Sequence, residues 1–323
     1  MQFVVIGAGN MGCVYGGNLA RIGQPVAFLD VWAEHVERIN THGLHVEGLT
    51  GVFDVTARAA TDVRELPPAD VVLICVNAYS TQAAAEAARQ VLKPEGCCLT
   101  LQNGVGNVEI LTAALGEKRV LAGLSFQSGD MAGPGSVRHT NNGPTYMGEL
   151  DRSRSPRLLE LAALFEQAGM HPDLVADVLT TIWGKFVHNC GINALCALTG
   201  LRPGHLQEVP AMLEFQNRIV AETVELLRAK GVTLTESDPG SAIKEYCSHK
   251  FHRVSMAQHL LRGQLTEIDS LNGYVAHESA RLGLAAPYSH ALTCLIKGRQ
   301  HHPADGGALT SEEQVSGATR ERA

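Results

Sequence analysis

The chain has 323 residues, which exceeds the usual size of a single hydrophobic core, so two domains are expected. Apolar residues make up 45% and charged residues 18%, as in ordinary folded proteins. The formal charge is −7 and no basic run occurs. This argues against nucleic acid as the main partner, because phosphate binding needs clustered Lys and Arg. A small anionic substrate, which needs only a few local positive groups, is not excluded.

Cysteine spacing and hydropathy exclude further classes. The eight cysteines are irregularly spaced without a C-x-x-C pair, so neither a zinc site nor a disulfide framework is predicted. We expect reduced, mostly buried thiols in a cytoplasmic protein. The apolar start of the chain lacks a basic segment and breaks at Gly7, which indicates a strand rather than a signal peptide. No run of 18 apolar residues occurs, so no membrane span is predicted.

The first half of the chain alternates β-like runs with helical stretches. In chain order, the expected elements are strand Gln2–Ile6, helix Cys13–Ile22, strand Pro25–Leu29, a helix ending at Ile39, a hairpin over Val46–Ala57, strand Val71–Val76, helix Thr81–Leu92, strand Cys97–Leu101, a helix ending at Leu115 and strand Arg119–Ser125. The nearly pure apolar run of Val71–Val76 is typical of a strand buried on both faces. This alternation predicts a mostly parallel sheet covered by helices on both faces.

The second half is dominated by helical periodicity. Residues 126–150 are rich in Gly, Asn and Pro, and they predict antiparallel strands and turns. Helices are then expected over Arg157–Gly169, Asp177–Ala197, Glu208–Lys230, Ile243–Leu261, Thr266–Leu282 and Pro287–Gln300. We therefore predict an α/β Rossmann N-terminal domain over residues 1–175 and an all-α C-terminal domain over residues 176–300. Residues 301–323 lack an apolar period and are predicted to form a disordered tail.

A glycine-rich loop follows the first expected strand. Residues 7–12 fit the pattern G-x-G-x-x-G, which in this position predicts a dinucleotide site. The first glycine permits a tight turn, the second lets the backbone approach a pyrophosphate, and the third permits close packing of helix on strand. Amides at the helix start then hold the phosphates. The expected cofactor contacts are Gly7, Ala8, Gly9, Asn10, Met11 and Gly12.

Asp30 lies eighteen residues after Gly12, at the end of the second expected strand. A carboxylate there accepts hydrogen bonds from both ribose hydroxyls of NAD and repels the 2′-phosphate of NADP, so NAD is favoured and NADP remains the alternative. Val31 supplies no compensating charge, although His35 and Arg38 are near in sequence. Asp30 could instead be only a helix N-cap.

Two asparagines follow later strands. Asn77 comes after Val71–Val76, and Asn103 comes after Cys97–Leu101. Open α/β sheets bind ligands at the carboxyl ends of their strands, so both residues are candidate ligand contacts. The dipeptide Asn103–Gly104 could equally form a turn.

A polar stripe marks the helix expected over Asp177–Ala197. Lys185, Asn189 and Asn193 recur every four residues, which puts them on one face of the helix. Burying such a stripe without partners is costly, so we expect a catalytic site. Lys185 can protonate an alkoxide as hydride reaches a carbonyl carbon, and the asparagines can bind substrate oxygens. The alternative is an exposed lysine with two interhelical asparagines.

A second polar cluster runs from Ser255 to Gly273. Within it, Glu267 is a candidate to pair with Lys185 or to bind a hydroxyl group. Alternatively, Thr266 or Ser270 caps a helix and the acidic residues favour its first turn. No group of residues suggests a metal site.

Together these motifs resemble the ketopantoate reductase (2-dehydropantoate 2-reductase) family. The resemblance covers residues 1–300 and rests on GAGNMG, LQNG at 101–104, GPGSVRHTNNGPTYMGE at 133–149, K-x-x-x-N-x-x-x-N at 185–193 and S-x11-TEID-x-x-NG at 255–273. It implies a Rossmann domain, a helical domain like the C-terminal one of 6-phosphogluconate dehydrogenase, and an active cleft between them. It also implies reduction of ketopantoate to pantoate on the route to pantothenate and coenzyme A.

The resemblance assigns roles to residues that the motifs had singled out. It implies Lys185 as general acid, with Glu267 as a cofactor or substrate contact. It implies substrate contacts from Asn103, Asn189, Asn193 and Ser255. The partners implied are a small 2-oxo acid and a nicotinamide cofactor, and the sequence is compatible with a homodimer.

Some positions depart from the family pattern. Family members that use NADP carry an arginine near position 31 and a lysine where Asn77 stands, and neither is present here. Two further substrate positions, often Asn, fall at Pro203 and His252. This leaves open another branched D-2-hydroxy acid, such as mandelate, as the substrate of an NAD-dependent dehydrogenase. A non-catalytic dinucleotide sensor, or another Rossmann dehydrogenase acting on a 3-hydroxyacid or an opine, are further alternatives.

Overall fold

The computed structural model describes residues 1–251 and 253–301, and it divides into two compact units. The first is Met1–Trp183 and the second begins at Gly184. The chain passes from one to the other within helix α6 (Val178–Thr199), whereas the sequence analysis placed the boundary between residues 175 and 176. Apart from His301, which ends α12, the predicted tail lies outside the described residues.

The first unit is built on one twisted sheet. Its strands are β1 (Phe3–Ile6), β2 (Val26–Leu29), β3 (Leu44–Gly48), β4 (Phe53–Val55), β5 (Arg58–Ala60), β6 (Ala69–Ile74), β7 (Leu92–Thr100), β8 (Val120–Gly133), β9 (Ser136–Glu149) and β10 (Pro172–Leu174). Their order is β4-β3-β9-β8-β7-β6-β1-β2-β5, with β10 on β9. The run from β8 to β5 is parallel throughout, as alternating strands and helices require.

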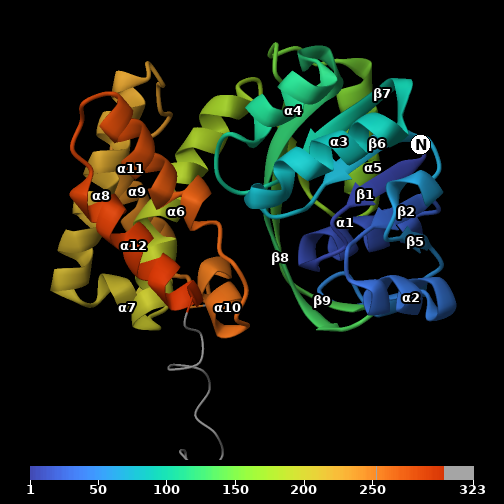
Figure 1. Cartoon of the computed structure of the whole chain (residues 1–323), viewed down its shortest axis with the longest axis horizontal. Coiled ribbons are helices and arrows are strands. Elements are labelled where there is room, and N and C mark those ends of the chain that lie inside the picture. Colours follow the sequence, from blue (N-terminus) through green and yellow to red (C-terminus); the bar gives the residue numbers. More distant parts are fainter. Residues whose placement is uncertain (252, 302–323) are drawn as a thin grey trace, which may run out of the picture. The chain divides into compact units, whose positions relative to one another are not determined.

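Helices cover both faces of this sheet (Figure 1). They are α1 (Asn10–Arg21), α2 (Ala33–His42), α3 (Thr81–Val91), α4 (Asn107–Leu115) and α5 (Pro156–Gln167). In β1, Phe3 and Val5 join the core formed with α1, α2 and α5, whereas Val4 and Ile6 join the core formed with α3 and α4. Alternate side chains of a strand point to opposite faces, so a wholly apolar β1 is buried on both.

The antiparallel strands predicted over residues 126–150 are confirmed, and they are longer and more continuous than expected. The strand expected at Arg119–Ser125 extends to Gly133 as β8 and pairs with β9 over almost its whole length. The short hairpin predicted over Val46–Ala57 is present as β3 and β4. A strand can continue through a Gly- and Asn-rich segment when a partner strand satisfies its backbone, which local propensity does not register.

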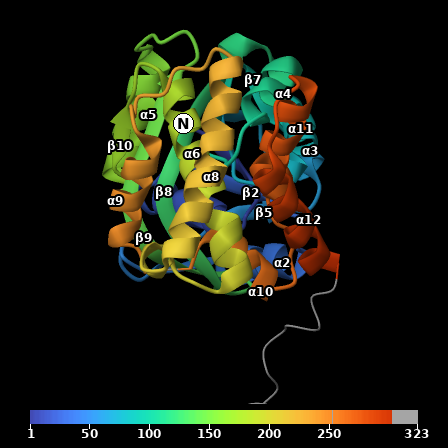
Figure 2. The ribbon, with the colours of Figure 1, turned by 90° about the vertical axis from the view of Figure 1, so that its left-hand side faces the viewer.

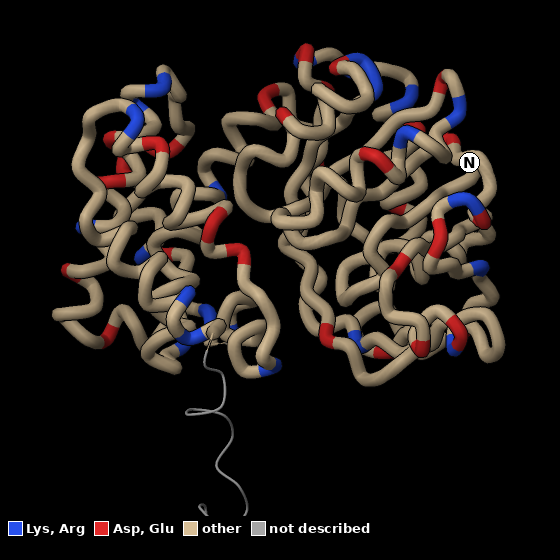
Figure 3. The backbone as a smooth tube through the Cα atoms, in the orientation of Figure 1, with Lys and Arg blue, Asp and Glu red and all other residues tan. Residues whose placement is uncertain are grey.

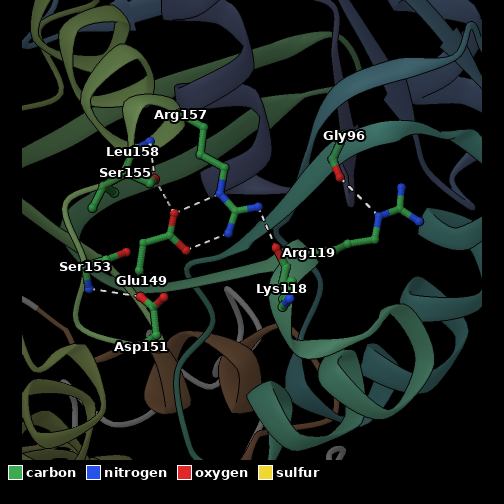
Figure 4. A network of polar contacts seen from close by, with 9 residues as sticks. All are labelled: Gly96, Lys118, Arg119, Glu149, Asp151, Ser153, Ser155, Arg157 and Leu158. Carbon is green, nitrogen blue, oxygen red and sulfur yellow. Dashed lines mark hydrogen bonds and ion pairs between the residues drawn. The ribbon is translucent and has the colours of Figure 1, made fainter.

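An ion pair between the buried Glu149 and the half-buried Arg157 anchors the end of β9 (Figure 4). Arg157 of α5 donates to Glu149 through Nε (2.8 Å) and Nη2 (2.6 Å), and the hydroxyl of Ser155 also donates to this carboxylate. Glu149 is only 5% exposed. The third guanidinium nitrogen donates to the carbonyl oxygen of Lys118, 2.6 Å away. Because the Arg157 guanidinium donates to both the Glu149 carboxylate and the Lys118 carbonyl, it connects β9, α5 and the turn before β8.

The second unit is helical. After α6 it comprises α7 (Pro203–Gln207), α8 (Pro210–Ala229), α9 (Pro239–Ser248), α10 (Ser255–Leu261), the 3-10 turn η4 (Ile268–Ser270), α11 (Asn272–Arg281) and α12 (Pro287–His301). Figure 2 shows α8 between α9 on one side and the α11–α12 pair on the other. Glu222 of α8 accepts from the amides of Tyr288 and Ser289 at the start of α12 (both 2.8 Å), which fixes the two helices together.

Three details of the helical prediction are wrong. Ile243–Leu261 is not one helix, because α9 ends at Ser248 and α10 starts at Ser255. The carbonyl of Lys250, between them, accepts from the Gly204 amide (2.8 Å), a tertiary bond that the sequence pattern does not reveal. Helix α7 was not predicted, and α11 begins only at Asn272, after η4.

Charged residues of both signs are interspersed along both units (Figure 3). Several form ion pairs, among them Lys93–Asp70 (2.6 Å) and Lys297–Asp269 (2.7 Å). Pairs of this kind are exposed to solvent and contribute little to stability individually. In the described residues, no helix is long and apolar enough to cross a membrane.

Candidate active site

The glycine-rich loop connects β1 to α1. Gly7 has φ +95°, and a Cβ there would lie 2.8 Å from the backbone nitrogen of Val76. A Cβ at Gly12 would lie 1.9 Å from the carbonyl oxygen of Gly7, so only glycine lets α1 start this close to the loop. A Cβ at Gly9 would meet no atom within 4 Å. The loop is thus closely packed at its first and third glycines and open at its second, which suits a bound pyrophosphate.

Asp30 is coupled directly to this loop. One carboxylate oxygen accepts from the Ala8 amide (2.7 Å) and the other from the Trp32 amide (2.9 Å). The N-cap residue of α2 is Trp32, which makes no side-chain cap bond, so Asp30 forms a turn before the helix rather than capping it. A carboxylate has about four lone-pair sites, and these two amides leave acceptor capacity for ribose hydroxyls.

The two residues that could have compensated a 2′-phosphate differ in environment. His35 is fully buried, and its Nδ1 accepts from the Gly135 amide (2.8 Å). Burial also lowers its pKa, so the ring is neutral at pH 7. Arg38 is exposed on α2, with its Cβ and Cγ against Gly135. Val31 is 95% exposed and carries no charge.

The carboxyl ends of β1, β6 and β7 are brought together by the sheet register. Ile6 is paired with Ile74, which in turn is paired with Thr100. The residues that follow these strands, including the glycine-rich loop, Asn77 and Asn103, therefore share one edge of the sheet. This is the edge at which open α/β sheets bind ligands.

The loops that carry Asn77 and Asn103 are held by a buried network that the sequence analysis missed. Gln102 donates from Nε2 to the carbonyl of Val76 (2.9 Å) and to the hydroxyl of Thr81 (2.8 Å). That hydroxyl lies 2.8 Å from Oδ1 of Asn107, to which it donates. In the sequence, this network was indicated only by Gln102, a polar residue directly after a buried strand. Asn107 also donates to the carbonyl of Asn103 (3.0 Å).

Asn77 and Asn103 themselves are both half-buried. The amide of the Asn77 side chain donates to the hydroxyl of Tyr79 (2.8 Å). Gly104 has φ +81°, so the Asn-Gly pair does form a turn, as the alternative interpretation held. The turn does not preclude a ligand role, because the Asn103 side chain lies at the binding edge.

The polar stripe lies on α6, in the helical unit from Gly184 onward. Lys185 and Asn189 are half-buried, and Asn193 is buried with 7% exposure. The fully buried Asn272, at the start of α11, donates to the carbonyl of Cys190 (3.1 Å) and fastens this helix to α6. The stripe is therefore partly shielded from solvent, with Asn193 its most deeply buried member.

Lys185 has an environment suited to proton transfer. Removal from solvent lowers the pKa of its ammonium group to about 8, while the negative charge of Glu267 acts in the opposite direction. The lysine is therefore mostly protonated at neutral pH and gives up its proton far more readily than an ordinary lysine. The neighbouring His188 also has its pKa lowered by burial.

Glu267 is 8% exposed and directly precedes η4. It makes no side-chain bond to the turn, whereas the hydroxyl of Thr266 accepts from the Ile268 amide (3.3 Å). Thr266 thus forms a turn just before η4, whose N-cap residue is Glu267. The amide of Thr266 donates to Oε1 of Gln300 (3.0 Å). The Glu267 carboxylate acts instead on the charge of Lys185.

Two other candidate residues each begin a short helix of the helical unit. Ser255 is exposed as the first residue of α10, and Pro203 is buried as the first residue of α7. His252 lies outside the described residues. In the part of the chain that the structure describes, no cluster of three or more metal-ligating side chains occurs.

The Rossmann sheet, the open glycine loop and the half-buried lysine define a dinucleotide-dependent oxidoreductase. Two family models match the chain: ketopantoate reductase PanE/ApbA over residues 3–152 and its C-terminal domain over residues 177–300. A 2-dehydropantoate 2-reductase of Halobacterium salinarum is 34% identical over 299 residues, covering 92% of this chain and 98% of that protein. The chain therefore belongs to the ketopantoate reductase family, and the family and fold predicted from the sequence are confirmed.

Solved structures agree with this assignment. A PanE/ApbA family ketopantoate reductase from Ralstonia eutropha is 33% identical with a TM-score of 0.86, covering 94% of this chain and 99% of that one. A D-mandelate dehydrogenase solved with NADH and anilino(oxo)acetate has the same TM-score at 22% identity, covering 94% of this chain and 99% of that one. At that identity the likeness shows a shared fold.

Proposed function

We propose that this chain reduces ketopantoate to pantoate, with Lys185 as the general acid. The nicotinamide cofactor, when bound, supplies the hydride. Lys185 donates a proton from Nζ to the substrate oxygen that becomes the new hydroxyl, and its positive charge stabilises that oxygen as charge develops. Asn189 and Asn193 orient the substrate by hydrogen bonds, together with Asn103 and Ser255.

The observation that carries this proposal is that Lys185 shares one face of α6 with Asn189 and Asn193. Burial lowers the pKa of this lysine to about 8, which supports the role. A general acid works best when its pKa lies near the operating pH, and an exposed lysine would be too weak an acid. A dinucleotide sensor would need only the loop and Asp30. The names of the relatives, 2-dehydropantoate 2-reductases, support ketopantoate as the substrate.

The cofactor we propose is NADH rather than NADPH. Asp30 already lies where an adenosine ribose is bound in Rossmann folds, and a 2′-phosphate there would face its negative charge. Val31 is uncharged, and both the burial and the hydrogen bond of His35 keep that ring from approaching a phosphate. Arg38 is the one nearby cation on α2 that opposes this preference.

A second candidate substrate is another branched D-2-hydroxy acid or its 2-oxo acid. Pro203 favours it, because a buried proline offers neither a side-chain amide nor a backbone N–H where relatives often carry asparagine. A substrate without a hydroxyl group facing Pro203 would lose no hydrogen bond at this position. The fold shared with a D-mandelate dehydrogenase is compatible with this alternative.

Steady-state rates, followed by the absorbance of the reduced nicotinamide at catalytic enzyme concentration, distinguish these proposals. Ketopantoate, benzoylformate and 2-oxoisovalerate are each offered with NADH and with NADPH. We expect the highest kcat/KM for ketopantoate with NADH. A higher value for benzoylformate would establish the mandelate-type alternative, and turnover of no 2-oxo acid would contradict both. Gel filtration of the same preparation tests whether the protein is a homodimer. We also propose a cytoplasmic location, where its eight thiols would stay reduced.

A further inference from the structure

We propose that Trp32 is the platform on which the adenine of the cofactor stacks, with His35 holding the indole in place. The inference rests on the proposed dinucleotide function and specifies its adenosine end. Trp32 lies two residues after Asp30, and its side chain is 40% exposed although it is large and apolar. Such a side chain at the rim of a nucleotide site is suited to a planar, uncharged ring.

The backbone of Trp32 is fixed relative to the rest of the nucleotide site. Its amide donates to Oδ1 of Asp30 (2.9 Å), while Oδ2 of the same carboxylate accepts from the Ala8 amide (2.7 Å). The phosphate-binding loop, the ribose-binding carboxylate and the indole are thus joined by two hydrogen bonds through one side chain. A ligand held at the loop and at Asp30 has its base next to Trp32.

The indole plane is fixed by His35. The two rings stack with centroids 5.1 Å apart and planes inclined by only 13°. His35 is itself fully buried and bonded at both nitrogens: Nδ1 accepts from the Gly135 amide (2.8 Å), and Nε2 lies 3.5 Å from the sulfur of Cys13. Because His35 occupies one face of the indole, the adenine takes the opposite face.

This arrangement also explains why a tryptophan suits a dinucleotide with a free 2′-hydroxyl. Val31, between Asp30 and Trp32, is 95% exposed and offers no charge to a 2′-phosphate. Stacking of the base on an aromatic ring supplies binding affinity without any positive group. A pre-organised ring also loses little conformational entropy when the base binds.

The test uses the full-length protein and isothermal titration with ADP-ribose, which carries the adenosine half of the cofactor without nicotinamide. Trp32→Ala should raise the Kd for ADP-ribose and for NADH by a similar factor, about tenfold, while kcat at saturating NADH stays unchanged. Trp32→Tyr should restore most of the affinity. Reduced nicotinamide mononucleotide, which lacks adenosine, should bind both variants as it binds the wild type.

A spectroscopic measurement guards against a general loss of structure. The chain has two tryptophans, so Trp183→Phe leaves Trp32 as the sole indole emitter. ADP-ribose should quench its emission, and thermal unfolding of Trp32→Ala should match the wild type. Wild-type affinity for ADP-ribose in Trp32→Ala, or no quenching, would overturn the platform. If the wild-type chain bound neither ADP-ribose nor NADH, the dinucleotide function itself would fail, which is a distinguishable result.

Discussion

The two units perform their parts of the proposed reaction by different means. In the α/β unit, the proposed nucleotide site is made mainly of backbone: a glycine loop, its amides and one carboxylate that accepts from the loop amide of Ala8 and from the amide of Trp32. In the helical unit, the site is made of side chains on α6, whose chemistry depends on how deeply they are buried. The first site therefore depends on backbone conformation, and the second depends on how far its side chains are shielded from solvent.

Removal of the acid in the helical unit should have the largest effect. Lys185→Ala should lower kcat for 2-oxo acid reduction by about 10²–10⁴-fold, the usual contribution of a general acid. The Kd for NADH, measured by titration, should stay near its wild-type value, because the loop and Asp30 belong to the other unit. Lys244→Ala, an exposed lysine on α9, is the matched control and should keep full activity. If Lys185→Ala retained most of its activity, the acid would have to be sought elsewhere.

Loss of the Glu149–Arg157 ion pair in the α/β unit should lower stability rather than activity. Glu149→Ala leaves the half-buried Arg157 guanidinium without its carboxylate, and we expect the free energy of unfolding to fall by about 1–3 kcal/mol, read from denaturant titration. Glu160→Ala, an exposed acid on α5, should change stability by less than about 0.5 kcal/mol. Equal effects for the two variants would show that the network in Figure 4 contributes nothing specific.

Cofactor choice tests how far Asp30 determines the nucleotide site. We expect kcat/KM for NADH to exceed that for NADPH by at least about tenfold, or roughly 1.4 kcal/mol. Asp30→Ala combined with Val31→Arg should narrow or reverse this ratio, because it replaces a repelling charge with an attracting one. Arg38→Ala in the wild-type background serves as the control and should leave NADH use unchanged. Equal kcat/KM values for NADH and NADPH in the wild type would show that Asp30 does not select the cofactor and only orders the loop.

The smallest effect is a displacement of the pH profile. Reduction needs protonated Lys185, so kcat/KM should fall as pH rises through about 8, its pKa in the folded protein. The charge of Glu267 raises that pKa, so Glu267→Gln should move the alkaline limb to lower pH. Asp269→Asn, exposed and paired with Lys297, should leave the limb in place. A limb that did not move, or moved to higher pH, would show that Glu267 does not act on Lys185.

The α/β unit was more predictable from the sequence than the helical unit. The elements of the α/β unit were predictable because strands buried on both faces are apolar runs and the loop needs glycine at fixed positions. In the helical unit, the division between α9 and α10 was not predictable, because no Gly or Pro marks residues 249–254. The bond from the Gly204 amide to Lys250 links segments that are distant in sequence. Gln102 escaped notice for the same reason, since its partners follow β6.

The sequence by itself determined the family, the two kinds of domain, the glycine loop, the placement of Asp30 after a strand and the K-x-x-x-N-x-x-x-N stripe. These are local patterns, set by backbone conformation and helical period. The tertiary structure was needed to show that burial lowers the pKa of Lys185 to about 8, that Thr266 forms a turn with the Ile268 amide, and that His35 is buried against Trp32. Each of these properties depends on desolvation or on a contact between segments far apart in the chain. The spacing of residues along the sequence predicts neither desolvation nor such contacts.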